Sequence, residues 1–194
     1  MKPVLVLYAT REGHSRRVAE YVAAALRTHD LVTHFADAGS VPADFSPAEY
    51  SAAILTASVH GSRHEPEMIQ FVKRHRGELE RIPTVFLSVS LSEAGAENTG
   101  ASPERRAQAS ADVKRMLEAF LAETGWRPTF VEPVAGALAY SRYNFFMRYI
   151  MRQISRKAGG DVDTSHDYEY TDWKALDRIV EEFVPAIAEP AVRA

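Results

Sequence analysis

The sequence contains no cysteine, which excludes disulfide bonds, thiolate metal sites and redox chemistry carried by thiols. It also has no apolar run near the roughly 20 residues that a membrane-spanning helix needs. Its first residues are too short and abrupt for a signal peptide. The net charge of −3 argues against a nucleic-acid partner. We therefore expect a cytoplasmic protein in which any redox chemistry depends on a cofactor.

The composition that is present belongs to a folded globular chain, with 194 residues of which 46% are hydrophobic and 25% charged. This length suits one domain with a real hydrophobic core. We expect a single domain over residues 1–188, with an insertion at 140–171 and a frayed tail at 189–194.

Apolar runs alternate with amphipathic segments, which predicts βαβ units and a parallel sheet covered by helices on both faces. The expected strands are residues 4–8, 31–35, 52–57, 84–89 and 129–138. The expected helices are residues 15–27, 67–75, 103–123 and 172–187. Five strands favour a doubly wound α/β fold smaller than a six-stranded dinucleotide-binding domain.

The loop between the first strand and the first helix carries the sharpest motif. It consists of Thr10, Arg11, Glu12, Gly13, His14 and Ser15. A loop at this place gathers backbone N–H groups and the positive end of the helix dipole, which together bind an anion. Because neither G-x-x-x-x-G-K-[ST] nor G-x-G-x-x-G occurs, the loop suits a monophosphate better than a triphosphate or pyrophosphate. The alternative is a hydroxyl-rich turn in which Ser15 only caps the helix.

Two later loops follow strands of the same expected sheet. Their candidate binding residues are Ser58, Val59, His60 and Gly61 after the third strand, and Ser90, Leu91 and Ser92 after the fourth. In a doubly wound sheet the ligand lies outside the carboxyl ends of the strands, so we expect all three loops to line one site. Within these loops we expect His60 and His64 to be solvent-exposed rather than acid–base groups. In the first loop, the two interpretations of His14 are a residue that helps to neutralise the phosphate and a residue exposed to solvent.

The motif Thr10-x-x-Gly13-x-Ser15 after an apolar strand resembles the FMN-phosphate signature of the flavodoxin family. The resemblance implies a flavodoxin-like fold and FMN as the cofactor, with its phosphate on the first loop and its ring against the two later loops. No residue pattern indicates a metal site or a catalytic side chain, so the flavin would carry the chemistry.

Residues 142–157 predict a basic amphipathic helix inserted before the last helix. Its apolar stripe consists of Tyr143, Phe146, Met147, Ile150, Met151 and Ile154. Arg148, Arg152 and Arg156 form a second stripe in a segment without acidic residues. One-sided charge of this kind is typical of a helix on an anionic membrane surface or against an acidic ligand. A helix that only packs on the domain is the alternative.

Motifs in the second half of the chain narrow the resemblance to one branch of the flavodoxin-like family, the menaquinone-dependent protoporphyrinogen IX dehydrogenases. These motifs are Trp126-Arg127-Pro128, Ala135-Gly136-Ala137-Leu138 followed by Tyr140-x-Arg142-Tyr143, Gly159-Gly160-x-x-Asp163-Thr164 and Tyr170-Thr171-Asp172-Trp173, together with Ser88-Val89-Ser90-Leu91. The resemblance implies oxidation of protoporphyrinogen IX in heme biosynthesis, with electrons passed to a membrane quinone. It also implies peripheral association with the inner face of the cell membrane.

Three arginines are candidates to hold either the propionates of the substrate or membrane phosphates: Arg142, Arg148 and Arg152. Two other functions stay open from the sequence, a flavodoxin-type electron carrier and an NAD(P)H:quinone reductase on the same fold. The oligomeric state is also open, with a homodimer among the options.

Overall fold

A computed structural model of the chain describes residues 2–142, 149, 155 and 163–188. The predicted amphipathic helix at 142–157 falls almost entirely outside the described residues, and Arg148 and Arg152 fall outside them with it. The predicted tail at 189–194 also lies outside, and the expectation of a single domain over 1–188 stays a prediction.

The centre of the molecule is a parallel sheet whose middle strands are apolar runs. The middle strands are β1 (Val4–Ala9), β3 (Ala52–His60) and β5 (Thr84–Ser90), and nearly all of their residues are buried. Burial on both faces is what a continuous apolar run predicts for a parallel strand. The edge strands β2 (Thr33–Asp37) and β6 (Phe130–Ala135) complete the order β2-β1-β3-β5-β6, with all neighbours parallel. The predicted five-stranded doubly wound sheet is confirmed.

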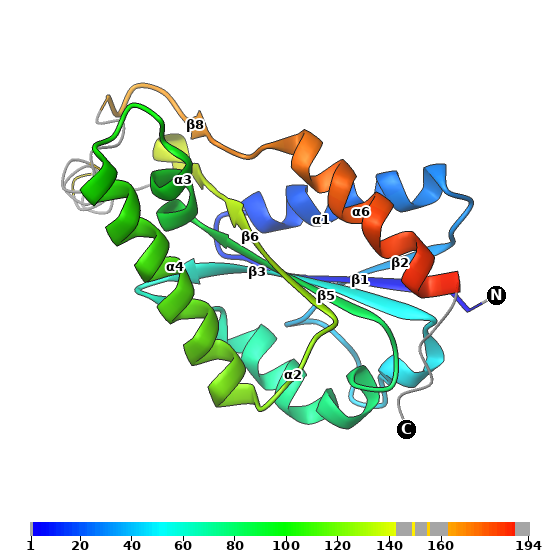
Figure 1. Cartoon of the computed structure of the whole chain (residues 1–194). Helices are drawn as coiled ribbons and strands as arrows, with labels where there is room; N and C mark the ends of the chain where they lie inside the picture. The colour runs from blue at the N-terminus through cyan, green and yellow to red at the C-terminus, as the bar shows by residue number, and fades with distance from the viewer. Residues whose placement is uncertain (1, 143–148, 150–154, 156–162, 189–194) are drawn as a thin grey trace.

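Helices cover both faces of this sheet (Figure 1). On one face, α1 (His14–Thr28) packs beside α6 (Trp173–Ala188). On the other face, α2 (Pro66–Leu79) lies beside α4 (Pro103–Thr124). The apolar periodicity predicts inward-facing residues on the first two helices, and Val18, Val22, Leu26, Met68, Phe71 and Val72 are buried, whereas Tyr21 is only partly buried.

Short elements at the carboxyl end of the sheet depart from the predicted boundaries. The expected strand 129–138 ends at Ala135, and β7 (Ala137–Leu138) leaves the sheet to pair antiparallel with β8 (Tyr168–Glu169). The segment after β5, expected as a loop, is the short helix α3 (Leu91–Glu97). After β3 the chain turns, and β4 (Arg63–His64) pairs antiparallel with the end of β3. Two 3₁₀ turns, η1 (Pro47–Glu49) and η2 (Tyr140–Arg142), join other elements.

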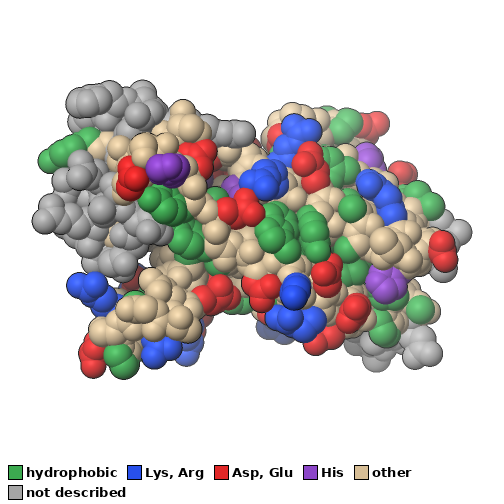
Figure 2. Space-filling model, turned by 90° about the horizontal axis from the view of Figure 1, so that it is seen from above, with side chains coloured by type: hydrophobic (Ala, Val, Ile, Leu, Met, Phe, Trp, Pro, Cys, Tyr) green, Lys and Arg blue, Asp and Glu red, His purple; other side chains and the backbone are tan. Residues whose placement is uncertain are grey.

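Within the described residues, no helix combines the length and the apolar character needed to cross a membrane. The face seen in Figure 2 shows acidic and basic side chains interspersed over the described part of the chain, with hydrophobic side chains between them.

Candidate functional site

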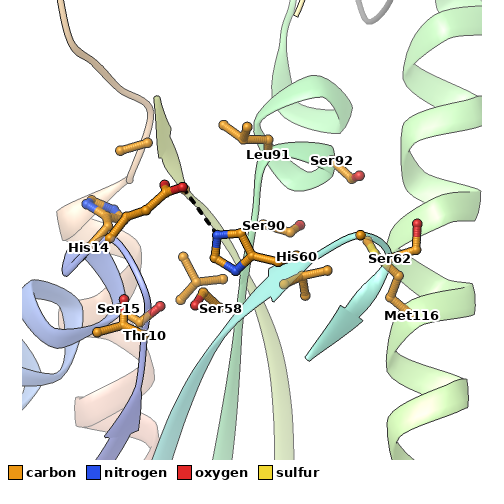
Figure 3. A pocket seen from close by; sticks show the side chains of 16 residues that line it. Thr10, His14, Ser15, Ser58, His60, Ser62, Ser90, Leu91, Ser92 and Met116 are labelled. Atoms are coloured by element: carbon orange, nitrogen blue, oxygen red, sulfur yellow. Dashed lines mark ion pairs between the residues drawn. The ribbon is translucent and has the colours of Figure 1, made fainter. Parts of the chain in front are cut away.

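A cavity of about 300 Å³ opens at the carboxyl ends of β1, β3 and β5 (Figure 3). It is lined by every predicted cofactor residue except Arg11 and Gly13, which line neighbouring hollows. The lining also includes residues that were not among the predicted cofactor contacts, namely Ser62, Val89, Met116, Gly136 and Ala137. The structure therefore brings the three predicted loops to one site.

The first wall is the loop from β1 to α1, and its shape depends on a glycine. Gly13 adopts a φ of 86°, in the left-handed region where a side chain would be strained. The Gly13 N–H donates to Thr10 Oγ1 over 3.0 Å, which folds the loop over the start of α1. Because Thr10 Oγ1 accepts this bond, its own O–H remains available as a donor.

Ser15 tests whether this wall fits a phosphate. The residue is fully buried in the first turn of α1 and lines the cavity. Among the described residues its hydroxyl has no hydrogen-bond partner. An unpaired buried hydroxyl costs free energy, and one that lines a cavity is placed to bond a molecule bound there. At a helix N-terminus that partner is best an anion, so the wall fits the phosphate of a cofactor.

His14 connects the same loop to a distant segment of the chain. Its Nε2 lies 2.7 Å from Thr171 Oγ1, and the Thr171 hydroxyl donates to the Ala135 carbonyl over 2.7 Å. Since a hydroxyl has one proton, His14 Nε2 is the donor to Thr171. Burial lowers the pKa of His14 below its ordinary value. At neutral pH the ring therefore supplies a hydrogen bond rather than a positive charge.

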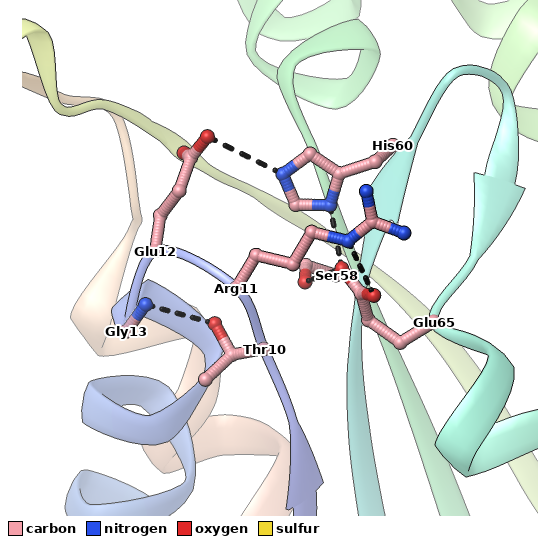
Figure 4. A network of polar contacts seen from close by, with 7 residues as sticks. All are labelled: Thr10, Arg11, Glu12, Gly13, Ser58, His60 and Glu65. Carbon is pink, nitrogen blue, oxygen red and sulfur yellow. Dashed lines mark hydrogen bonds and ion pairs between the residues drawn. The ribbon is translucent and has the colours of Figure 1, made fainter. Parts of the chain in front are cut away.

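The second wall is organised around Glu65, a carboxylate with 2% of its side chain exposed (Figure 4). Arg11 Nε donates to Glu65 Oε2 over 2.9 Å. His60 Nδ1 and Ser58 Oγ both donate to Glu65 Oε1, over 2.6 Å and 3.1 Å. These donors satisfy the buried charge, as burial requires. One carboxylate thus ties the phosphate loop, the end of β3 and the start of α2 together.

His60 differs from its predicted role, because 28% of its side chain is exposed and both ring nitrogens face carboxylates. Its Nε2 lies 3.4 Å from Glu12 Oε1, and in Figure 4 the two side chains point toward each other. The hydrogen bond to Glu12, together with the charges of Glu12 and Glu65, raises the pKa of the His60 imidazole, against the opposing effect of burial. The expectation of a solvent-exposed loop histidine is wrong here.

His64 is also not an exposed loop histidine, since it is 2% exposed. Its Nε2 lies 2.8 Å from Ser88 Oγ, and its ring packs against Phe86 and Phe120. The antiparallel return of β4 turns the side chain into the core beneath the site. Burial lowers the pKa of the imidazole to about 4, so His64 is a neutral core residue.

The third wall forms where β5 meets α3. Ser90 Oγ accepts a hydrogen bond from the Glu93 N–H over 3.1 Å and so caps the short helix. Gly136 N–H donates to the Ser90 carbonyl over 2.9 Å, and a Cβ on Gly136 would lie 3.3 Å from the Ser90 carbonyl atoms. A glycine at this position therefore lets the two chain segments approach closely and places Leu91 on the cavity.

Glu65 and Thr171 are the functional candidates that sequence reasoning missed. Glu65 stands before Pro66 and outside each motif considered, so no local signal marks a buried carboxylate there. Thr171 lies in the segment Tyr170-Thr171-Asp172-Trp173, which drew attention through resemblance and not through an expected contact. Its bonds to His14 and Ala135 span 157 and 36 residues of sequence, which spacing alone does not reveal.

Comparison with known proteins shows one family match and similar relatives over nearly the full length of the chain. The model of the flavodoxin domain matches residues 5–165. A protoporphyrinogen IX dehydrogenase [quinone] of Escherichia coli (strain K12) is 29% identical over 191 residues, which cover 97% of this chain and 98% of the relative. A protein of the same name from Leishmania major is 30% identical over 196 residues, covering 98% of this chain and 79% of the relative.

Solved structures give the same fold at lower identity. A short-chain flavodoxin associated with a non-canonical PDU bacterial microcompartment superposes with a TM-score of 0.56 at 12% identity, covering 96% of this chain and 99% of the other. Oxidised Flavodoxin 1 from Bacillus cereus gives a TM-score of 0.52 at 14% identity, covering 94% and 97%. Both comparisons support the fold, which is flavodoxin-like.

Proposed function

The chain belongs to the flavodoxin domain family, and from this premise we propose that it oxidises protoporphyrinogen IX with FMN as its cofactor and passes the electrons to a membrane quinone. The observation that carries the proposal is the similarity to protoporphyrinogen IX dehydrogenases over 97% of this chain and 98% of the Escherichia coli relative. Similarity of this extent includes the segment between β6 and α6, which carries the motifs Tyr140-x-Arg142-Tyr143 and Tyr170-Thr171-Asp172-Trp173.

FMN, the cofactor of this family, supplies the electron-transfer chemistry when it is bound. In our proposal, the hydroxyls of Thr10 and Ser15 and the N–H groups at the start of α1 hold its phosphate. The chain segments Ser58–Gly61 and Ser90–Ser92 enclose its ring. Glu65 holds the first two walls at a fixed separation through Arg11 and His60.

The cavity wall bears on the choice between an enzyme and an electron carrier. Among the described residues that line the cavity, none is Trp, Tyr or Phe. A cofactor ring without an aromatic cover leaves room for a second flat molecule to stack on it. This favours an enzyme over a simple carrier.

The proposed substrate carries anionic propionates, for which the planar guanidinium of arginine is a matched partner. Arg142, Arg148 and Arg152 remain our candidates for this role or for contact with an anionic membrane surface. Arg148 and Arg152 lie outside the described residues, so their assignment rests on the sequence. Contact with the membrane would bring the site to the place where quinones reside.

The test is an anaerobic assay with FMN-loaded protein, protoporphyrinogen IX and a soluble quinone analogue. We expect porphyrin fluorescence to appear well above the rate of a protein-free control, and to appear poorly when NADP⁺ replaces the quinone. Exclusion of air suppresses spontaneous oxidation. A protein that gives no rate above the control, yet reduces quinone rapidly with NADPH, is instead an NAD(P)H:quinone reductase.

A further inference from the structure

His60 is held between two carboxylates that come from different parts of the chain. Nδ1 lies 2.6 Å from Glu65 Oε1, and Nε2 lies 3.4 Å from Glu12 Oε1. Glu12 precedes α1 and Glu65 precedes α2, whereas His60 ends β3. Figure 4 shows the imidazole between the two acidic side chains, and the same ring lines the cavity.

This arrangement favours the charged form of the ring. A neutral imidazole has one N–H and one lone pair, so it satisfies one carboxylate and repels the other. An imidazolium donates to both carboxylates. Glu65 is 2% exposed, and a buried carboxylate gains most from a charged donor. The raised pKa of His60 has the same origin.

We propose that Glu12 and Glu65 hold His60 as a cation on the cavity wall, and that this fixed positive charge favours the reduced state of the cofactor ring. The proposal rests on the proposed function only in taking FMN as the occupant of the cavity. The oxidised ring is neutral, and uptake of two electrons and one proton leaves it with one negative charge. The electrons come from the porphyrinogen substrate, or from dithionite in the experiments below.

His60 shares its cluster with two carboxylates and one guanidinium, on Glu12, Glu65 and Arg11, so protonation of His60 makes the cluster neutral and its loss leaves a net negative charge beside the cavity. Arg11 lies on the far oxygen of Glu65 and neutralises that carboxylate from outside. Arg63, the partner of His60 in the β3–β4 pair, turns to Glu123 on α4, with its Nη2 2.8 Å from Glu123 Oε1. Glu12, with 27% of its side chain exposed, faces the cavity together with the His60 ring.

The coupling between the charge of the cofactor ring and the charge of His60 is reciprocal. It can be measured as a shift in the pKa of His60 or as a shift in the midpoint potential of the cofactor. A unit charge within roughly 10 Å at an effective dielectric constant of about 20 changes an equilibrium about tenfold. We therefore expect the pKa of His60 to rise by about one unit when the bound cofactor is reduced. The same tenfold effect lowers the two-electron midpoint potential by about 30 mV in His60→Gln, at a pH below the pKa of His60.

The first measurement is an NMR titration of the His60 ring nitrogens in the full-length protein, oxidised and then reduced with dithionite. Glu65→Gln and Glu12→Gln should each lower the pKa of His60. Glu67→Gln is the matched control, because Glu67 lies two residues from Glu65 on an exposed position of α2 and should leave the pKa unchanged. An unshifted His60 pKa in the oxidised protein overturns the proposed cation.

The second measurement is the midpoint potential of bound FMN across pH, for the native protein, His60→Gln and the exposed-site control His29→Gln. The difference between native protein and His60→Gln should shrink as the pH rises through the pKa of His60. Equal potentials for the native protein and His60→Gln overturn the coupling. A protein that titrates as expected but oxidises no porphyrinogen defeats the proposed substrate and leaves the cation intact.

Discussion

The hydroxyls of Thr10 and Ser15 in the first loop differ in their hydrogen bonds within the protein. Thr10 Oγ1 accepts the Gly13 N–H, whereas the buried hydroxyl of Ser15 has no partner among the described residues. A hydroxyl that the fold leaves unsatisfied is free to bond a ligand. Ser15 is therefore the more specific indicator of the proposed phosphate site, and we propose that Thr10 serves both the loop and the ligand.

The double substitution Thr10→Ala with Ser15→Ala should weaken FMN binding by one to several orders of magnitude. Each lost hydrogen bond to a charged group costs roughly 1.5–3 kcal/mol, and about 1.4 kcal/mol corresponds to a tenfold change in Kd. Fluorescence titration of FMN measures the effect. Ser110→Ala, on an exposed face of α4, is the control and should bind FMN normally. Unchanged affinity in the double variant would contradict the phosphate assignment.

His64 makes the stability of the protein depend on pH. Its pKa is about 4 in the folded state, against an ordinary value of 6.5, so the unfolded chain takes up the proton first. The contribution of His64 to the free energy of unfolding is therefore complete above pH 6.5. It is lost as the pH drops toward 4, which lowers the free energy of unfolding by up to about 3 kcal/mol. In His64→Gln this part of the pH dependence should vanish.

Urea unfolding at several pH values between 4 and 7.5 tests the role of His64. Each curve compares the native protein with His64→Gln, and the exposed residue His29 provides a second variant, His29→Gln, as control. Other titrating groups contribute equally to all three proteins. Parallel dependence on pH in native protein and His64→Gln would show that burial of this ring does not set the slope.

The sequence could not distinguish His60 from His64 as the structure does. Both stand in one short segment of small and polar residues, and no local pattern states that the chain reverses at Gly61 and Ser62. The reversal pairs β4 with β3 and turns His64 into the core, while His60 stays at the cavity. Long-range packing therefore determines the environment of each imidazole, and the local sequence does not indicate that environment.

At the scale of elements, two glycines should respond to substitution in opposite directions. Gly125 ends α4 with a φ of 66°, whereas Gly77 lies inside α2, where an added Cβ would meet no atom within 4 Å. Gly125→Ala should lower the free energy of unfolding by about 1 kcal/mol through strain at a left-handed position. Gly77→Ala should raise it by about 0.5–1 kcal/mol through helix propensity.

Thermal and urea unfolding of the two glycine variants, side by side, checks both signs. The two substitutions add the same methyl group, so the comparison isolates the backbone conformation. The added Cβ at Gly125 would also approach Arg76 Nη1 at 2.7 Å, but this is the far end of a flexible side chain that moves easily. Lost stability in Gly77→Ala, or unchanged stability in Gly125→Ala, would contradict the conformational explanation.

Long elements were predictable because several signals agree along their length. The helix α4 has Ser102 as its cap, Pro103 at its first position and Gly125 after its end, and the predicted bounds differ from the observed ones by one residue. The two-residue strands β7 and β8 pair across about thirty residues and carry no periodicity. The short helix α3 was missed because seven residues with Gly95 inside them give a weak local preference.

At the scale of the whole molecule, topology explains why the cavity could be located before its contacts were known. Parallel strands end at the same edge of the sheet, so the loops after β1, β3 and β5 meet there regardless of their sequence. The contacts that fix the site join segments far apart in the sequence, as in the hydrogen bond between His14 and Thr171 across 157 residues. The strand order therefore predicts where the cavity lies, whereas tertiary packing determines which residues contact one another there.

The last prediction concerns association with membranes, which we propose from residues 142–157. Arg148→Gln with Arg152→Gln removes two charges from the basic stripe and should weaken binding to anionic vesicles about thirtyfold, at about 1 kcal/mol per residue. High salt should weaken the binding of the native protein in the same direction, because salt screens exposed charges. Sedimentation with vesicles of anionic and neutral lipids measures both effects.

A matched control removes the same charge from a described helix. Lys114→Gln with Arg115→Gln on α4 alters two side chains that are 77% and 65% exposed, and it should leave vesicle binding unchanged. The porphyrinogen assay on the arginine variant then separates the two roles of the stripe. A raised KM with normal vesicle binding assigns these arginines to the substrate, whereas lost vesicle binding at normal KM assigns them to lipid. Equal pelleting of all variants with neutral and anionic vesicles would contradict a charge-driven membrane contact.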